Sequence, residues 1–248
     1  DFTYIRRHNQ LIDRASNSNM DEATKNHWIG VSRFLRAMEY AELVRNFGDV
    51  PWFDKVIENT DYENLYKPRD SRATVMDNVL ADLQFACENI LKADGTKGLT
   101  INKAVALAFT SRLMLFEGTW QKYRAKNNDL AKKYLQAAKD AADKLMAMGE
   151  YSIHKDWKEL TSSISLAGNP EVILYREYEM GVKTHSLMSF QNTEAEGSSP
   201  SRSLVDSYLS ANGLPIYQTE NTMFKGDKWF FDEMADRDPR LYANVRPD

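Results

Sequence analysis

Residues 33–51, RFLRAMEYAELVRNFGDVP, say most about the fold of this chain. Apolar side chains recur every three or four residues here and just before, which is the spacing of one face of an α-helix. Gly48 can adopt the left-handed conformation that ends a helix, and Pro51 cannot continue one. Asp21 is a suitable N-cap, so the pattern predicts one long amphipathic helix that ends at Phe47. Its apolar stripe consists of Val31, Phe34, Leu35, Met38, Ala41 and Val44.

Four further helices are predicted around this one from the same periodicity, over about residues 4–15, 71–90, 102–118 and 128–148. Ser71 and Asn102 are expected N-caps, and Gly118 is expected to end the fourth helix. Small residues at 104, 106, 108 and 111 would let this helix approach its neighbours closely. Helices joined by short turns predict a mainly α fold of antiparallel pairs, an α-α superhelix of the tetratricopeptide type.

The character of the sequence changes after Gly149. The stretch EVILYREY, residues 171–178, is rich in β-branched and aromatic residues and predicts a short strand. A long loop over residues 180–200 follows, then a short helix capped by Ser201 and another over 229–234. We therefore expect two domains, a helical-repeat region over 1–150 and an irregular region over 151–248 that carries the ligand site.

Composition argues against several classes of function. The net charge is -4 with both signs interspersed, so no basic field is available for nucleic acid. No apolar run approaches the ~20 residues that span a bilayer. The single cysteine, Cys87, excludes an internal disulfide, and the four histidines form no ligand pair at helical spacing. No cofactor and no metal site are therefore expected.

Residues 33–51 resemble the most recognisable motif of the SusD/RagB family of outer-membrane nutrient-binding lipoproteins. Further stretches are similar to family segments and occur in the family's order along nearly the whole chain. They are DSRATVMDNVLADLQFA (70–86), the helix over 103–116, NPEVILYREY (169–178), PSRSLVDSYLSANGLPI (200–216) and DRDPRLY (236–242). Each motif alone is modestly specific, whereas the ordered set is strong.

The resemblance implies a non-catalytic receptor at the cell surface. Such proteins are anchored to the outer membrane by a lipidated N-terminal cysteine, and they deliver oligosaccharides or other nutrients to a TonB-dependent, SusC-like β-barrel transporter. This sequence departs from the family in lacking that cysteine, because Cys87 lies within a helix. It also stops soon after the Asp-Pro-Arg motif, where family members continue. We therefore expect a partial chain, incomplete at its C-terminal end.

The candidate ligand-binding residues are chosen because sugars are bound by aromatic faces together with amide and carboxylate groups. Four of them lie in the loop over 180–200, since binding residues gather on loops held by a rigid framework. An alternative is that this loop is merely solvated, with its aromatic ring tucked in. Trp28, Trp120 and Trp157 are expected to pack inside the protein. The candidates are Phe190, Gln191, Asn192 and Glu194 in the loop, together with Trp52 and Trp229.

An enzyme is not expected. Glu194 and Glu196 lie close in sequence, but nothing marks them as the acid and base pair of a glycoside hydrolase. Nucleophile-elbow, phosphate-loop and zinc-protease motifs are absent from the sequence. The alternatives are a helical-repeat scaffold that binds another protein and, less favoured, a glycoside hydrolase.

Overall fold

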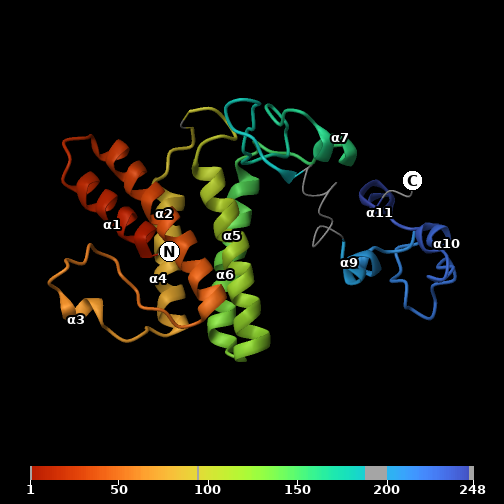
Figure 1. Cartoon of the computed structure of the whole chain (residues 1–248), viewed down its shortest axis with the longest axis horizontal. Coiled ribbons are helices and arrows are strands. Elements are labelled where there is room, and N and C mark those ends of the chain that lie inside the picture. Colours follow the sequence, from red (N-terminus) through yellow and green to blue (C-terminus); the bar gives the residue numbers. More distant parts are fainter. Residues whose placement is uncertain (1, 94, 188–199, 246–248) are drawn as a thin grey trace. The chain divides into compact units, whose positions relative to one another are not determined.

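A computed structural model describes residues 2–93, 95–187 and 200–245 of the chain (Figure 1). The packing divides it into two compact units. The first unit comprises residues 1–153 and 166–176, and the second comprises residues 154–165 and 177–248. No helix among the described residues is long and apolar enough to cross a membrane.

The first unit is built from five long helices, which pack in the order α1, α2, α4, α5, α6 (Figure 1). Short turns make α1 and α2, and likewise α5 and α6, antiparallel neighbours. The backbone N–H of Arg72 at the start of α4 donates to Asp49 just after α2 at 2.8 Å, so these two helices are antiparallel as well. The expected fold of antiparallel helix pairs is confirmed. The helices are α1 (Phe2–Ser16), α2 (Glu22–Phe47), α4 (Arg72–Asn89), α5 (Lys103–Trp120) and α6 (Asn128–Ala147).

The predicted helix caps are confirmed. The side chains of Asp21, Ser71 and Asn102 each accept a hydrogen bond from the backbone N–H three residues further on. Gly48 ends α2 with a φ of 72°, and its N–H donates to the carbonyl of Val44 at 2.9 Å. These caps fix where each helix starts and stops, and so fix which apolar residues face the core.

The helix ending expected at Gly118 is wrong. The helical path continues through Trp120 into one π-helical turn, η1 (Gln121–Ala125), and ends at Lys126 with a φ of 56°. Gly118 lies inside α5 against α6, where an added Cβ would stand 2.7 Å from Cγ of Leu135. The glycine therefore serves close helix packing, and its position near the helix end made it resemble a stop signal.

The strand expected over residues 171–178 is also wrong. This segment is extended but pairs with no strand in the described part of the chain, and Tyr175 N–H donates to the carbonyl of Gly98 at 2.9 Å. Ile173 packs against the helical core. Ile173 and Tyr175, two of the side chains that suggested a strand, thus pack against the first unit.

Short elements complete the structure. Within the first unit, α3 (Tyr62–Leu65) lies in the connector between α2 and α4. The second unit contains α7 (Trp157–Ser162), α9 (Arg202–Ser207), α10 (Phe230–Met234) and α11 (Pro239–Asn244). Its buried apolar residues, among those described, are Ile216, Met234 and Leu241. The second unit is therefore held together largely by polar contacts and turns.

Candidate ligand-binding surface

Four of the six predicted ligand residues, Phe190, Gln191, Asn192 and Glu194, lie outside the described residues. Their role stays a prediction. The two tryptophans that were predicted with them can be placed. They lie in different units and have different surroundings.

Trp52 is fixed in the connector after α2. Its N–H donates to Oδ2 of Asp70 at 2.7 Å, and its carbonyl accepts a hydrogen bond from Nζ of Lys67 at 2.8 Å. Its half-buried ring lies 4.2 Å, centre to centre, from the ring of Tyr40 and 5.3 Å from the guanidinium carbon of Arg36. These contacts hold the connector against α2, so Trp52 has a structural role in the first unit.

A buried ion pair lies close to Trp52. Arg36 on α2 donates to both carboxylate oxygens of Asp82 on α4, each at 2.8 Å. Its Nη1 also donates to Oδ1 of Asn9 on α1 at 2.6 Å and to the carbonyl of Asp54 at 3.0 Å. One arginine thereby joins three helices and the connector.

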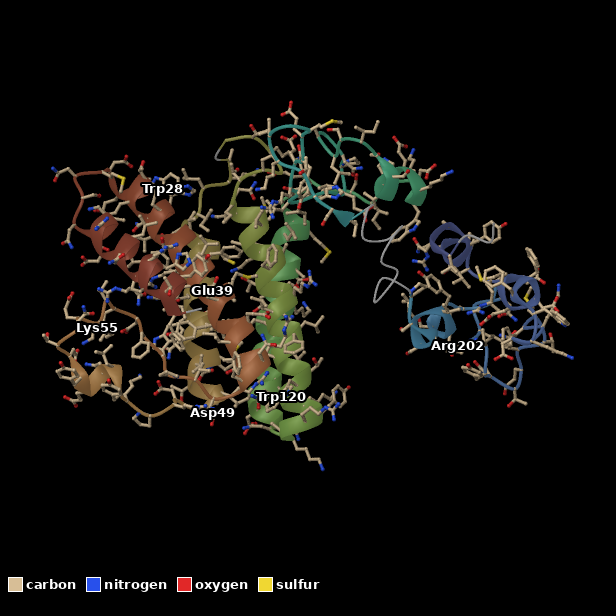
Figure 2. All side chains as sticks on the ribbon, viewed as in Figure 1. Trp28, Glu39, Asp49, Lys55, Trp120 and Arg202 are labelled. Atoms are coloured by element: carbon tan, nitrogen blue, oxygen red, sulfur yellow. The ribbon has the colours of Figure 1, made fainter. Side chains whose placement is uncertain are left out.

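A second buried ion pair lies where α2 ends and α4 begins. Nη2 of Arg72 is 2.7 Å from Oε2 of Glu117 on α5, and Gln121 donates to Oε1 of Glu117 at 2.8 Å. The guanidinium carbon of Arg72 lies 3.7 Å from the centre of the half-buried Trp120 ring. Figure 2 labels Asp49 and Trp120 at this end of the helices.

Arg36 lies in the motif over 33–51, and Arg72 and Asp82 lie in the motif over 70–86. These motif residues therefore contribute to folding. Both ion pairs were missed by sequence reasoning, although each involves charged residues at inward-facing helix positions. A charge in an apolar stripe is the signal that could have found them, because a buried charge requires a partner.

Trp229 lies in the second unit and is exposed. It precedes α10, and together with Phe230 and Phe231 it forms what we call the aromatic surface. The exposed fractions of these three side chains are 65%, 43% and 71%. The rings of Phe230 and Phe231 meet edge to face at 6.0 Å, and Nζ of Lys228 lies 5.9 Å from the Trp229 ring. Three neighbouring large apolar side chains in water are costly unless they bind something.

Arg202 on α9 holds the segment that carries this surface (Figure 2). Its guanidinium pairs with Asp227 at 3.2 Å and with Glu233 at 2.8 Å, so it contacts residues on both sides of the aromatic surface. It also pairs with Asp206 at 2.9 Å within its own helix. The aromatic residues are thus flanked by a charged cluster that limits their movement.

Arg237 also binds the segment that carries the aromatic surface. Its guanidinium donates to the carbonyls of Glu233, Val205 and Tyr208 at 3.1, 2.8 and 2.8 Å. The backbone pairs of Ala211 with Asp236 and of Asp238 with Leu209 extend this connection between α9 and α10. This unit buries few apolar side chains. Hydrogen bonds to the carbonyls at the ends of its short helices therefore supply part of what holds it together.

The acidic residues of the cluster are all bound by neighbouring side chains. A hydrogen bond from the hydroxyl of Tyr217, at 2.7 Å, lowers the pKa of Asp206 below its usual value, and the Arg202 guanidinium acts in the same direction. Asp227 and Glu233 are also paired with Arg202. A general acid needs a raised pKa, so Asp206 is poorly suited to that role. Among the described residues, no three His, Cys, Asp or Glu side chains are placed so that they could hold a metal ion.

The other tryptophans complete the comparison with expectation. Trp120 is half-buried under Arg72, as expected for packing. The expectation that Trp28 and Trp157 pack inside is wrong, since each is 41% exposed. Trp28 packs one edge against His27, and Trp157 directs its Nε1 toward Oδ1 of Asn244 at 3.4 Å. Each contact leaves part of the indole in water.

Comparison with known proteins gives a consistent result. No family model matches the chain. SusD-like protein P2 of Formosa agariphila is 32% identical over 115 residues, which cover 46% of this chain and 22% of that protein. SusD-like protein P38 of the same organism is 27% identical over 161 residues, which cover 61% of this chain and 28% of that protein.

A solved structure has the same fold. The SusD-like carbohydrate binding protein from Bacteroides fragilis superposes with a TM-score of 0.70 and 22% identity, over 96% of this chain and 44% of that one. The chain thus spans less than half the length of each of these proteins. Over the part that it spans, the chain is similar in sequence to SusD-like proteins and shares the fold of a SusD-like protein.

Proposed function

We propose that this chain binds an oligosaccharide through the aromatic surface Trp229, Phe230 and Phe231, as part of a non-catalytic nutrient receptor at the cell surface. The observation that carries the proposal is the exposure of these three rings on a segment fixed by Arg202. The name of the Bacteroides fragilis relative as a carbohydrate binding protein supports the same class of ligand.

The chemistry of the surface suits a sugar. The face of a pyranose ring is lined by C–H groups that pack on an aromatic face, and its hydroxyls need polar partners at the rim. The charged side chains of Lys228, Asp227 and Arg202 can supply such partners beside the rings. Phe190, Gln191, Asn192 and Glu194 remain proposed contributors from the loop over 180–200.

The likeness to SusD-like proteins supports the rest of the proposal. We propose that the whole protein is held at the outer membrane by a lipid anchor and delivers its ligand to a TonB-dependent transporter. The helical unit is the proposed framework for this role. Its buried ion pairs make it suited to hold a binding region in place.

Binding by Trp229→Ala tests the proposal. Calorimetry with oligosaccharides of β-1,3-glucan, xyloglucan and α-glucan should find a ligand for the unaltered chain. Trp229→Ala should weaken its binding by about 1–2 kcal/mol, as expected for an aromatic contact residue. The melting temperature should change little, because the side chain is 65% exposed.

Trp28→Ala is the matched control, since Trp28 is an exposed tryptophan of the first unit. It should leave affinity unchanged. Equal affinity of Trp229→Ala and the unaltered chain would refute the aromatic surface as the site. A loss in Phe190→Ala instead would place the site in the loop over 180–200.

A further inference from the structure

A cavity of about 230 Å³ lies between α1 and the connector after α2, within the first unit. None of its lining residues belongs to the aromatic surface. Five of its lining residues are apolar and come from both segments: Phe2, Ile5, Phe53, Ile57 and Leu65. Polar side chains occupy the remaining positions: Arg6, Asn9, Lys55 and Asn59. Figure 2 labels Lys55 on this connector.

The walls of the cavity are held in place by hydrogen bonds. Asn9, which is buried, donates from Nδ2 to the carbonyls of Phe53 and Lys55 at 3.0 and 2.9 Å. Its Oδ1 accepts the hydrogen bond from Arg36. Arg6 donates from Nη1 to the carbonyl of Ile57. The connector is thereby fixed to α1 at three backbone positions, and a cavity formed in advance costs little ordering on binding.

The charge of the lining is one-sided. Among the described residues that line it, Arg6 and Lys55 are charged and none is acidic. Neither cation pairs with a carboxylate within the described part of the chain, and this in a chain whose net charge is -4. Two cations beside five apolar side chains form an environment for an anion with an apolar body.

We propose that this cavity binds a small amphiphilic carboxylate, with its hydrocarbon part against Phe2, Phe53 and Leu65 and its head at Arg6 and Lys55. Arg6 uses Nη1 for the Ile57 carbonyl, which leaves the N–H groups of Nε and Nη2. These two donors match the two oxygens of a carboxylate. The ammonium group of Lys55 adds a second positive charge from the connector.

Titration of the full chain with octanoate, followed by calorimetry, tests this site. Octanoate should bind, and 1-octanol, which has the same chain length and no charge, should bind at least about tenfold more weakly. Arg6→Gln should weaken octanoate binding about tenfold, the loss expected for a charge-assisted hydrogen bond. Lys55→Gln should weaken it several-fold, since this exposed side chain contributes its charge alone.

Arg7→Gln is the matched control. It removes the same charge from the next residue of α1, where the guanidinium lies over the Tyr4 ring and not in the cavity. Its affinity for octanoate should equal that of the unaltered chain. Absence of octanoate binding, equal binding of octanol, or equal losses in Arg6→Gln and Arg7→Gln would each overturn the proposal. Lys55→Gln keeps the test decisive if Arg6→Gln lowers the melting temperature, because Lys55 is exposed and its truncation should change stability little.

Discussion

At the scale of single residues, the first unit depends on charges buried among apolar side chains. Arg36 with Asp82 and Arg72 with Glu117 join neighbouring helices, and the paired residues lie 46 and 45 positions apart in the sequence. Periodicity showed which positions face inward, and so which charges must find partners. It could not show which residue each one meets, because that depends on how the helices are placed in space.

Glu117→Gln should destabilise the first unit by about 3 kcal/mol. The glutamate is 1% exposed, so the change leaves the Arg72 guanidinium in the interior without its counter-charge. Urea unfolding followed by circular dichroism measures the loss. Glu42→Gln is the control, because Glu42 pairs with Arg45 in water and should change the unfolding midpoint little. Equal midpoint shifts in the two variants would show that the buried pair contributes nothing beyond a surface pair.

At the scale of elements, local signals gave the helix starts correctly. Asp21, Ser71 and Asn102 are capping residues whose effect acts over three residues, so the sequence alone contains it. The errors arose where a residue type serves a distant contact. Gly118 accommodates Leu135 of the neighbouring helix, and Ile173 in the apolar run over 171–178 packs against the helical core instead of lying in a sheet.

Gly118→Ala should destabilise the pairing of α5 with α6. Alanine favours a helix, but its Cβ would lie 2.7 Å from Cγ and 3.0 Å from the backbone N of Leu135. The helices must move apart, at a net cost of about 1–2 kcal/mol in thermal or urea unfolding. Leu135→Ala in the same chain should recover part of this loss by removing the side-chain clash. If Gly118→Ala alone is as stable as the unaltered chain, the two helices have space for the added methyl group and the prediction is wrong.

At the scale of the whole molecule, the candidate site was only partly predictable. Trp229 stood out because it begins a run of three aromatic residues next to a short helix. The ion pairs of Arg202 that hold this segment could not be predicted, because Arg202 is 25 residues from Asp227 in the sequence. Trp52 was selected for the same chemistry, yet its surroundings give it a structural role. Aromatic type alone therefore cannot separate a candidate binding ring from a packing ring, and the contacts around each ring are needed as well.

The two units should also differ in stability, because they bury apolar residues to different extents. The core of the first unit draws on five long helices, whereas the second unit buries Ile216, Met234 and Leu241 among its described residues. Amide hydrogen exchange should therefore be faster in peptides from residues 202–245 than in those from 72–147.

Leu241→Ala and Leu83→Ala each truncate a fully buried leucine, one in each unit. Leu241→Ala should remove protection in 202–245 and leave 72–147 unchanged, and Leu83→Ala should lower protection in 72–147. Loss of protection in both regions from Leu241→Ala would show that the chain unfolds as one cooperative unit.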